Sequence, residues 1–272
     1  MIADERGLSQ FGPSRRRILL GLAAALAVPV TAAAETGLTI AAAADVRQAL
    51  DAIVGLFETA NGSAKVRVTY GSSGNLARQI AQAAPFELFL SADEAIADRL
   101  IAEGYAEGPG FVYGVGRLAL IVRRDSPIEV ERGMSGIADA VARKQITWFA
   151  IANPVHAPYG ERAKEVLEKS GLWGVVGGQL RLPLLLGENV AVPAQYVITG
   201  AAEAGITALS LVKSGDAATA LRYSVIPAEL HAPLRQRMVL TRSASPAARA
   251  LYAYIASAEA QAILRASGFE QP

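Results

Sequence analysis

Short apolar runs and amphipathic helical patterns alternate along most of the chain. The segment 38–42 (LTIAA) is typical of a buried strand, and 46–59 follows it with Leu50, Ile53 and Phe57 on one helical face. Further strand patterns lie at 66–70, 86–90, 146–151, 181–186 and 205–209, and most of them are followed by a helix pattern. Strands that alternate with helices of this length predict an α/β fold whose mainly parallel sheets are flanked by helices.

The alternation is interrupted once, by a long β-rich segment at 111–123 (FVYGVGRLALIVR) that contains Gly114 and Gly116. Such a segment suits a crossover between two lobes. A second α/β unit follows, and the return to the first lobe is predicted to begin at 223–227. Helix patterns at 246–257 and 258–266 close the chain. The predicted organisation is one lobe from 35–114 with 230–272, and a second lobe from 115–229.

The first 34 residues are typical of an export signal rather than of a folded element. A basic cluster (SRRR, 14–17) precedes an apolar run of 13 residues and the small-residue stretch 32–34 (AAA). That run is too short for a bilayer, which needs about 20 residues. The arginines also fit a twin-arginine signal. We therefore predict a signal peptide over 1–34, a mature chain that begins near Glu35, and a periplasmic location.

The composition of the predicted mature chain excludes several classes of partner. Removing 34 residues from 272 leaves 22 basic and 23 acidic residues, a net charge near −1 without a basic run. This argues against nucleic acid or an anionic membrane surface as partner. The chain has no cysteine, so it has no disulfide and no lipid anchor on cysteine. We expect a monomer that does not insert into a membrane.

Four polar turns share one design, because each comes directly after a strand pattern and directly before a helix pattern. They lie at 43–45 (AAD), 71–75 (GSSGN), 153–160 (NPVHAPYG) and 187–190 (GENV). Ligands of open α/β sheets bind at the carboxyl ends of the strands. Helix N-termini offer unpaired N–H groups and a partial positive charge. Since no turn contains lysine or arginine, the four together predict a compact anion held by amides and hydroxyls.

Nearly the whole mature chain resembles the periplasmic molybdate-binding proteins of the ABC importer family. The resemblance lies in TIAAAADVRQAL, YGSSGNLARQI, APFELFLSADE, ANPVHAPYG, GENVAVPAQYVITG and ALYAYIASAEAQAILRASGF. It implies a two-lobed periplasmic binding protein fold of type II, with the ligand cleft between the lobes. It also implies capture of molybdate, and of tungstate, for delivery to the membrane permease of an importer. The molybdenum would be bound only as its oxyanion, without a cofactor and without a side chain on the metal.

The resemblance also implies five ligand-binding residues. In the family the first turn presents a serine or asparagine, at the position of Asp45 here, and the second presents a serine, Ser72 or Ser73. The third and fourth turns offer the backbone N–H groups of Tyr159 and Val190. One branch of the family adds a tyrosine hydroxyl where this chain has Ala208, and the hydroxyl of Tyr159 would replace it.

Asp45 departs from this pattern, because an ionised carboxylate repels a dianion. Three readings remain open from the sequence. The side chain caps its own helix, which we favour because aspartate is a common N-cap residue. Alternatively it is protonated in the closed cleft and donates a hydrogen bond. In the third reading the ligand is not the usual dianion.

Other functions fit the sequence less well. The same fold would also bind sulfate or a small organic anion. A regulatory effector-binding domain is opposed by the predicted signal peptide. A serine hydrolase would use Ser72 or Ser73 with His156 or His231, but GSSG is not the G-x-S-x-G elbow. A metalloenzyme is not indicated, because the chain has neither an HExxH motif nor a cysteine. The chain is therefore predicted to be a binding protein and not an enzyme.

Overall fold

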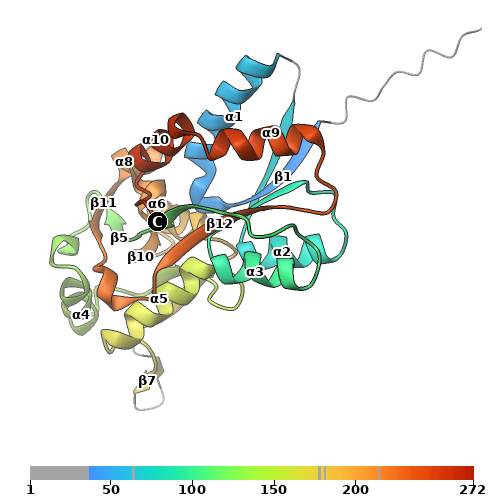
Figure 1. Cartoon of the computed structure of the whole chain (residues 1–272). Helices are drawn as coiled ribbons and strands as arrows, with labels where there is room; N and C mark the ends of the chain where they lie inside the picture. The colour runs from blue at the N-terminus through green and yellow to red at the C-terminus, as the bar shows by residue number, and fades with distance from the viewer. Residues whose placement is uncertain (1–36, 63–64, 177–178, 181, 214) are drawn as a thin grey trace, which may run out of the picture. The chain divides into compact units, whose positions relative to one another are not determined.

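The chain forms two five-stranded sheets (Figure 1). The computed structural model describes residues 37–272 except 63–64, 177–178, 181 and 214, so the predicted signal peptide lies outside the described residues. The first sheet has the order β2 (Val66–Gly71), β1 (Leu38–Ala43), β3 (Leu88–Ser91), β12 (Leu234–Leu240) and β4 (Phe111–Gly116). The second has the order β11 (Leu221–Val225), β5 (Leu118–Arg123), β10 (Ala204–Ala208), β6 (Phe149–Ala152) and β9 (Leu184–Gly187). Each sheet with its helices is one lobe.

Each sheet has a parallel core extended by antiparallel strands. In the first lobe β1 pairs in parallel with β2 and β3, whereas β12 runs antiparallel to β3 and β4. In the second lobe β6 pairs in parallel with β9 and β10, whereas β5 runs antiparallel to β10 and β11. The fold is thus the expected two-lobed α/β fold, but its sheets are mixed rather than mainly parallel, because β12 and β5 each add antiparallel pairs on both sides.

The chain crosses between the two sheets twice. The first crossing joins β4 to β5 at Arg117, inside the β-rich segment that interrupts the sequence pattern. The second runs from β11 to β12 through the short turn η3 (Ala228–Leu230). Because β4 pairs with β12 and β5 pairs with β11, the two crossing segments join neighbouring strands at both ends.

Helices cover both faces of the first sheet. On one face lie α1 (Arg47–Asn61), α9 (Pro246–Ile255) and α10 (Ala258–Ala266), and on the other lie α2 (Ser73–Ala81) and α3 (Glu94–Ala102) (Figure 1). Alternation along β3 supplies both cores, since Leu88 and Leu90 join the cluster under α1 while Phe89 joins the cluster under α2.

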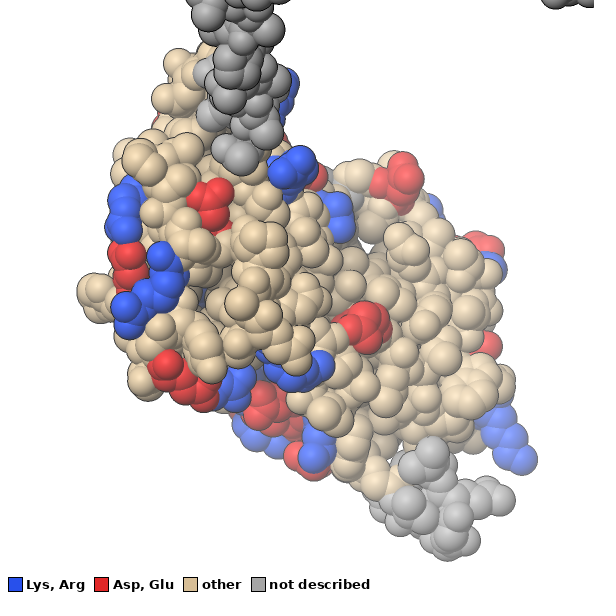
Figure 2. Space-filling model, turned by 90° about the vertical axis from the view of Figure 1, so that its right-hand side faces the viewer, with Lys and Arg blue, Asp and Glu red and all other residues tan. Residues whose placement is uncertain are grey.

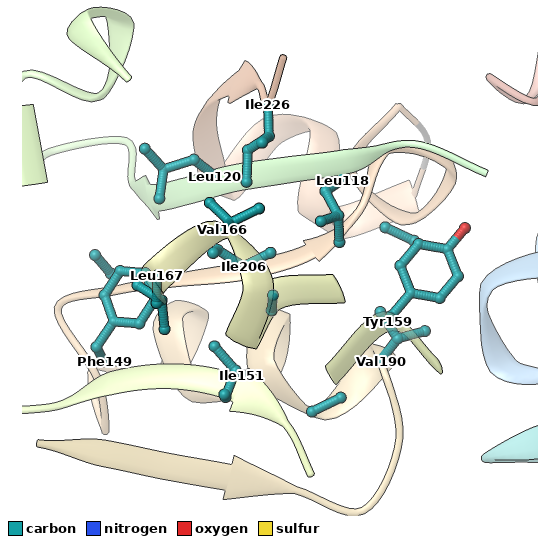
Figure 3. Packing of buried hydrophobic residues seen from close by; sticks show 14 of the residues in the cluster. Leu118, Leu120, Phe149, Ile151, Tyr159, Val166, Leu167, Val190, Ile206 and Ile226 are labelled. Atoms are coloured by element: carbon teal, nitrogen blue, oxygen red, sulfur yellow. The ribbon is translucent and has the colours of Figure 1, made fainter. Parts of the chain in front are cut away.

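The second sheet is covered in the same way. One face packs against α4 (Met134–Ala142) and α5 (Pro158–Lys169), in the cluster shown in Figure 3. The other face packs against α6 (Ala191–Thr199), α7 (Leu209–Val212) and α8 (Gly215–Ala220). The short ladder of β7 (Val175–Val176) and β8 (Gln179–Leu180) completes the described elements, with the 3-10 turns η1 (Ala44–Val46) and η2 (Val130–Arg132). None of the described helices is long and apolar enough to span a membrane.

Candidate functional site

The four polar turns lie at the carboxyl ends of β1, β2, β6 and β9, two in each lobe. They meet at one small cavity, whose volume is about 10 Å³. All five residues proposed from the sequence line it, together with small and apolar neighbours: Ala43, Ala44, Asp45, Gly71, Ser72, Ser73, Ala92, Ala157, Pro158, Tyr159 and Val190. Asp45 is the only charged residue among them, and no lysine or arginine belongs to this wall.

Three helix N-termini face this cavity. Ser72 is the N-cap of α2, Tyr159 is the second residue of α5, and Val190 is the N-cap of α6. The first N–H groups of a helix have no partner inside the helix and carry the positive end of its dipole. The wall therefore favours an anion although it holds no fixed cation.

Ser73 is fully buried and its hydroxyl is oriented by the backbone of the next strand-to-helix turn. Its Oγ accepts a hydrogen bond of 2.9 Å from the N–H of Ala92. A hydroxyl has one proton to donate besides the lone pairs with which it accepts. The proton of Ser73 is thus available to a group in the cavity. Since α2 begins at Ser73 and Ser72 is its N-cap, both serines stand at its N-terminus.

Ser72 makes a contact between the lobes instead of capping α2. Its Oγ lies 2.9 Å from Nδ1 of His156, in the turn that precedes α5, and it makes no capping hydrogen bond. The backbone oxygen of His156 also accepts a 3.0 Å hydrogen bond from the N–H of Gly74. A Cβ on Gly74 would lie 2.6 Å from that oxygen, so only glycine allows this approach.

Asp45 is almost completely buried, with 1% of its surface exposed, and joins a hydrogen-bonded network across the cleft. Its Oδ2 accepts from the hydroxyl of Tyr159 at 2.9 Å and from Nε2 of Gln236 at 2.6 Å. Gln236 also donates to the Tyr159 hydroxyl at 3.0 Å and accepts from the hydroxyl of Tyr113 at 2.6 Å. In Figure 3 the Tyr159 oxygen points away from the apolar cluster of the second lobe.

This geometry contradicts one expectation from the sequence. The favoured capping role of Asp45 is wrong, because neither η1 nor α1 has a capping hydrogen bond from a side chain. The partners of Asp45 lie far away in sequence, on α5 and β12. The hydroxyl of Tyr159, which the resemblance places at the ligand, donates its proton to Asp45 in this structure.

Burial controls the protonation of this network. Loss of water raises the pKa of Asp45 to about 6, against the opposing effect of hydrogen bonds from Gln236 and Tyr159 and of the nearby N–H groups of Asp45 and Val46. Burial and then the charge of Asp45 raise the pKa of Tyr159 and of Tyr113 well above the ordinary tyrosine value. Both tyrosines therefore stay neutral near neutral pH.

Sequence reasoning missed three residues of this network: Gln236, Tyr113 and Gly116. A Cβ on Gly116 would lie 2.1 Å from the Tyr159 hydroxyl and 2.6 Å from Nε2 of Gln236, so this glycine makes room for the network. A signal for Gln236 existed, because it occupies an inward position in the alternating pattern of β12 between Leu234 and Met238. A polar residue at a core position is more informative than an exposed one.

A second, more exposed set of contacts also joins the lobes. Glu188, before α6, accepts a hydrogen bond from Asn75 of α2, and its carboxylate lies 3.7 Å from Nε2 of His156. Arg162 of α5 lies 3.6 Å from Asp93, which caps α3. A cleft of about 640 Å³ opens beside these contacts, lined by residues from α2, α3 and α5. On the face in Figure 2, acidic and basic side chains are interspersed, without a broad area of one sign.

Two α/β lobes, crossed twice by the chain and meeting at a small polar cavity of helix N-termini, define a solute-binding protein. Comparison with known families agrees. Residues 38–270 match the model of the family described as "Bacterial extracellular solute-binding protein", and the chain belongs to that family.

Relatives with assigned ligands extend this result. The chain is 34% identical to the molybdate-binding protein ModA of Azotobacter vinelandii, over 94% of this chain and 98% of that protein. It is 32% identical to ModA of Rhodobacter capsulatus, over 96% and 99%. The solved periplasmic molybdate-binding protein of Azotobacter vinelandii superposes with a TM-score of 0.77 at 28% identity, covering 86% of this chain and 99% of that one.

Proposed function

We propose that this chain captures molybdate, and also tungstate, between its lobes and delivers it to an ABC importer. The observation that carries the proposal is the cavity wall, where three helix N-termini and the Ser73 hydroxyl converge without a fixed cation. The chain matches relatives named as molybdate-binding proteins over nearly their whole length, which supports the choice of ligand.

The backbone and one hydroxyl would hold the oxyanion. In this proposal the N–H groups of Tyr159 and Val190 and the hydroxyl of Ser73 donate to its oxygens, and no side chain binds the molybdenum atom. Ser72 then serves mainly to join the lobes through His156, because its Oγ is already paired with the imidazole. Hydrogen bonds to a charged group contribute about 1.5–3 kcal/mol each, so a few of them suffice for tight binding.

The proposal includes the route and the partners of the protein. Residues 1–34 would direct export to the periplasm, and the mature chain would act there as a monomer, with the membrane permease of the importer as its protein partner and no nucleic acid. The membership of the strands in two sheets supports the proposed lobes, 35–114 with 230–272 and 115–229, with β4 of the first sheet extending to Gly116.

A hydrolase was the remote alternative, and Ser72, His156 and Glu188 do have a spacing that a nucleophile and its base could use. The relatives, however, are binding proteins over nearly their full length. The interlobe contact accounts for all three side chains.

Titration calorimetry of the mature protein with molybdate, tungstate, sulfate and phosphate tests the proposal. We expect molybdate and tungstate to bind most tightly, and Ser73→Ala to weaken molybdate binding by about 1.5–3 kcal/mol. The substitution also removes the acceptor of the Ala92 N–H, so binding is measured well below the unfolding midpoint.

Ser135→Ala is the matched control, because this serine is exposed on α4 and donates to the backbone of Arg132. It should bind molybdate like the parent. Preference for sulfate or a small organic anion would contradict the ligand assignment, and normal binding by Ser73→Ala would contradict the site.

A further inference from the structure

The two carboxylate oxygens of Asp45 have different surroundings. Oδ2 accepts hydrogen bonds from Tyr159 and Gln236. Oδ1 is buried and has no partner with hydrogen-bond geometry among the described residues, although the N–H groups of Asp45 and Val46 lie near the carboxylate. Because Asp45 lines the small cavity and is 1% exposed, bulk solvent does not reach Oδ1, and its partner would be a molecule held in that cavity. A buried polar atom without a partner is costly, so it indicates a group that binds there.

The sign of the charge decides what that group can be. An ionised Oδ1 would repel any oxygen of a dianion held by the helix N-termini, and no lysine or arginine in the cavity wall offsets this repulsion. A protonated Oδ1 carries an O–H that donates a hydrogen bond into the cavity, as a serine or asparagine would. Oδ2 keeps both of its hydrogen bonds in either state.

We propose that Asp45 binds the oxyanion as the neutral acid and donates the proton on Oδ1, so that each captured dianion is accompanied by one proton. The inference rests on the proposed function, because it requires a dianion in this cavity. It assigns to Asp45 the role of a ligand-binding and specificity-determining residue that favours fully ionised oxyanions over those that carry a proton of their own.

The surroundings of Asp45 support this assignment. Burial already raises its pKa to about 6 without a ligand, and a bound dianion would raise it further. The titratable groups that face it are Tyr159 on α5 and Tyr113 on β4, and both stay neutral. Gln236 does not titrate, and neither does Ser210, which donates to the Asp45 backbone oxygen. His156 contacts Ser72 on the same cavity wall, so the variant His156→Asn tests its part separately.

Calorimetry with molybdate at several pH values, in two buffers of different ionisation enthalpy, measures both the affinity and the number of protons taken up. We expect the affinity of the parent to fall about tenfold for each pH unit above the pKa of the free site. At about pH 7.5, binding should take up close to one proton. Asp45→Asn should bind more tightly than the parent at that pH, without proton uptake, because its amide N–H replaces the acid proton.

Asp45→Ser is a second variant that places a hydroxyl in the same turn and does not titrate, and it should also bind independently of pH. His156→Asn separates the two candidate proton acceptors: it should keep the proton uptake of the parent. If proton uptake persists in Asp45→Asn and disappears in His156→Asn, the proposal is overturned in favour of the imidazole.

The ligand-free protein gives an independent measurement. The folded-state pKa of Asp45 is raised above the unfolded value of 3.8, so the folded protein binds more protons between these two pKa values. Its contribution to stability is therefore fully present below about pH 4 and is lost as the pH rises through about 6. The difference between the thermal midpoints of Asp45→Asn and the parent should grow over this range. A constant difference would overturn the assignment.

Two further outcomes separate this inference from the proposed function. A parent that binds molybdate without proton uptake overturns the inference alone. So does a large loss of affinity in Asp45→Asn, which would show that the carboxylate acts as an acceptor for a protonated ligand. A parent that binds neither molybdate nor tungstate at any pH overturns the proposed function and the inference together.

Discussion

Two sets of contacts join the lobes, and they differ in their access to water. The inner bridge consists of Asp45, Tyr159, Gln236 and Tyr113, each no more than 3% exposed. The outer bridge consists of Ser72, Gly74 and Asn75 facing His156 and Glu188, and the Glu188 side chain is 64% exposed. Hydrogen bonds in a dry interior are strong when complete and costly when broken, whereas exposed ionic contacts contribute little.

The comparison indicates a division of roles. The inner bridge adjoins the small cavity, so its integrity and its proton should set the affinity. The outer bridge brings α2 against the turn before α5, so it should affect how closely the lobes approach. Substitutions in the two bridges should then have different effects on stability and on binding.

The largest effect is expected from Gly116→Ala. Its Cβ would meet the Tyr159 hydroxyl and Nε2 of Gln236, so the network must move apart inside the cleft. Overpacking together with unpaired buried groups should cost about 3 kcal/mol of unfolding free energy. Molybdate affinity should fall by at least about a hundredfold. Urea unfolding and calorimetry measure the two effects.

Gly55→Ala is the matched control for this substitution, because it adds the same methyl group to an exposed position of α1 with nothing within 4 Å. It should raise stability slightly and leave binding unchanged. Parent-like binding by Gly116→Ala would show that the inner bridge does not set the affinity.

Gly74→Ala should have an intermediate effect, confined to binding. The added Cβ would lie 2.6 Å from the backbone oxygen of His156, so the lobes could not approach as closely. Each lobe keeps its own core, and alanine favours the helical conformation of α2. We expect affinity to fall about tenfold while the unfolding free energy stays within about 1 kcal/mol of the parent. A large loss of stability would mean that the two lobes depend on this contact to fold.

The smallest effect is expected from Glu188→Gln. The amide oxygen can still accept from Asn75, and only the charge near His156 is lost. Since the side chain is mostly exposed, the change in binding free energy should be within about 0.5 kcal/mol, measured by calorimetry at low and high salt. A loss as large as that of Gly116→Ala would remove the distinction between the two bridges.

The sequence alone predicted most of the elements and the position of the cavity. Strand and helix periodicities are local features of the sequence. A turn that connects a strand to a helix lies at the end of the strand, whichever elements the rest of the chain forms. The helix α4 was missed, because its buried face consists of the small residues Gly136 and Ala140 and of Ile137 alone among the large apolar residues. On Gly136 a Cβ would lie 2.2 Å from the backbone oxygen of Glu129, so the start of this helix packs closely against the preceding turn.

The inner bridge could not be predicted in the same way. Asp45 is followed directly by a helix pattern, so its local sequence indicates a cap. Its actual partners, Tyr159 and Gln236, are 114 and 191 residues away. Which side chains meet depends on how β12 returns to the first sheet and on how the lobes face each other. Neither relation leaves a periodic trace in the sequence, although the inward polar residue of β12 indicated that a partner existed.

The two crossings between the sheets have a mechanical consequence. Because β4 pairs with β12 and β5 pairs with β11, the connecting segments run between neighbouring strands and would act together as a hinge. Two lobes joined by such a hinge can rotate easily about one axis, whereas sliding and twisting of one lobe against the other are resisted. The polar turns of one lobe must then arrive at those of the other simultaneously. The contacts between the turns, each of which is weak, would thus form or break together in one cooperative step. Through the hinge, the binding of a small ion would change the shape of the whole molecule.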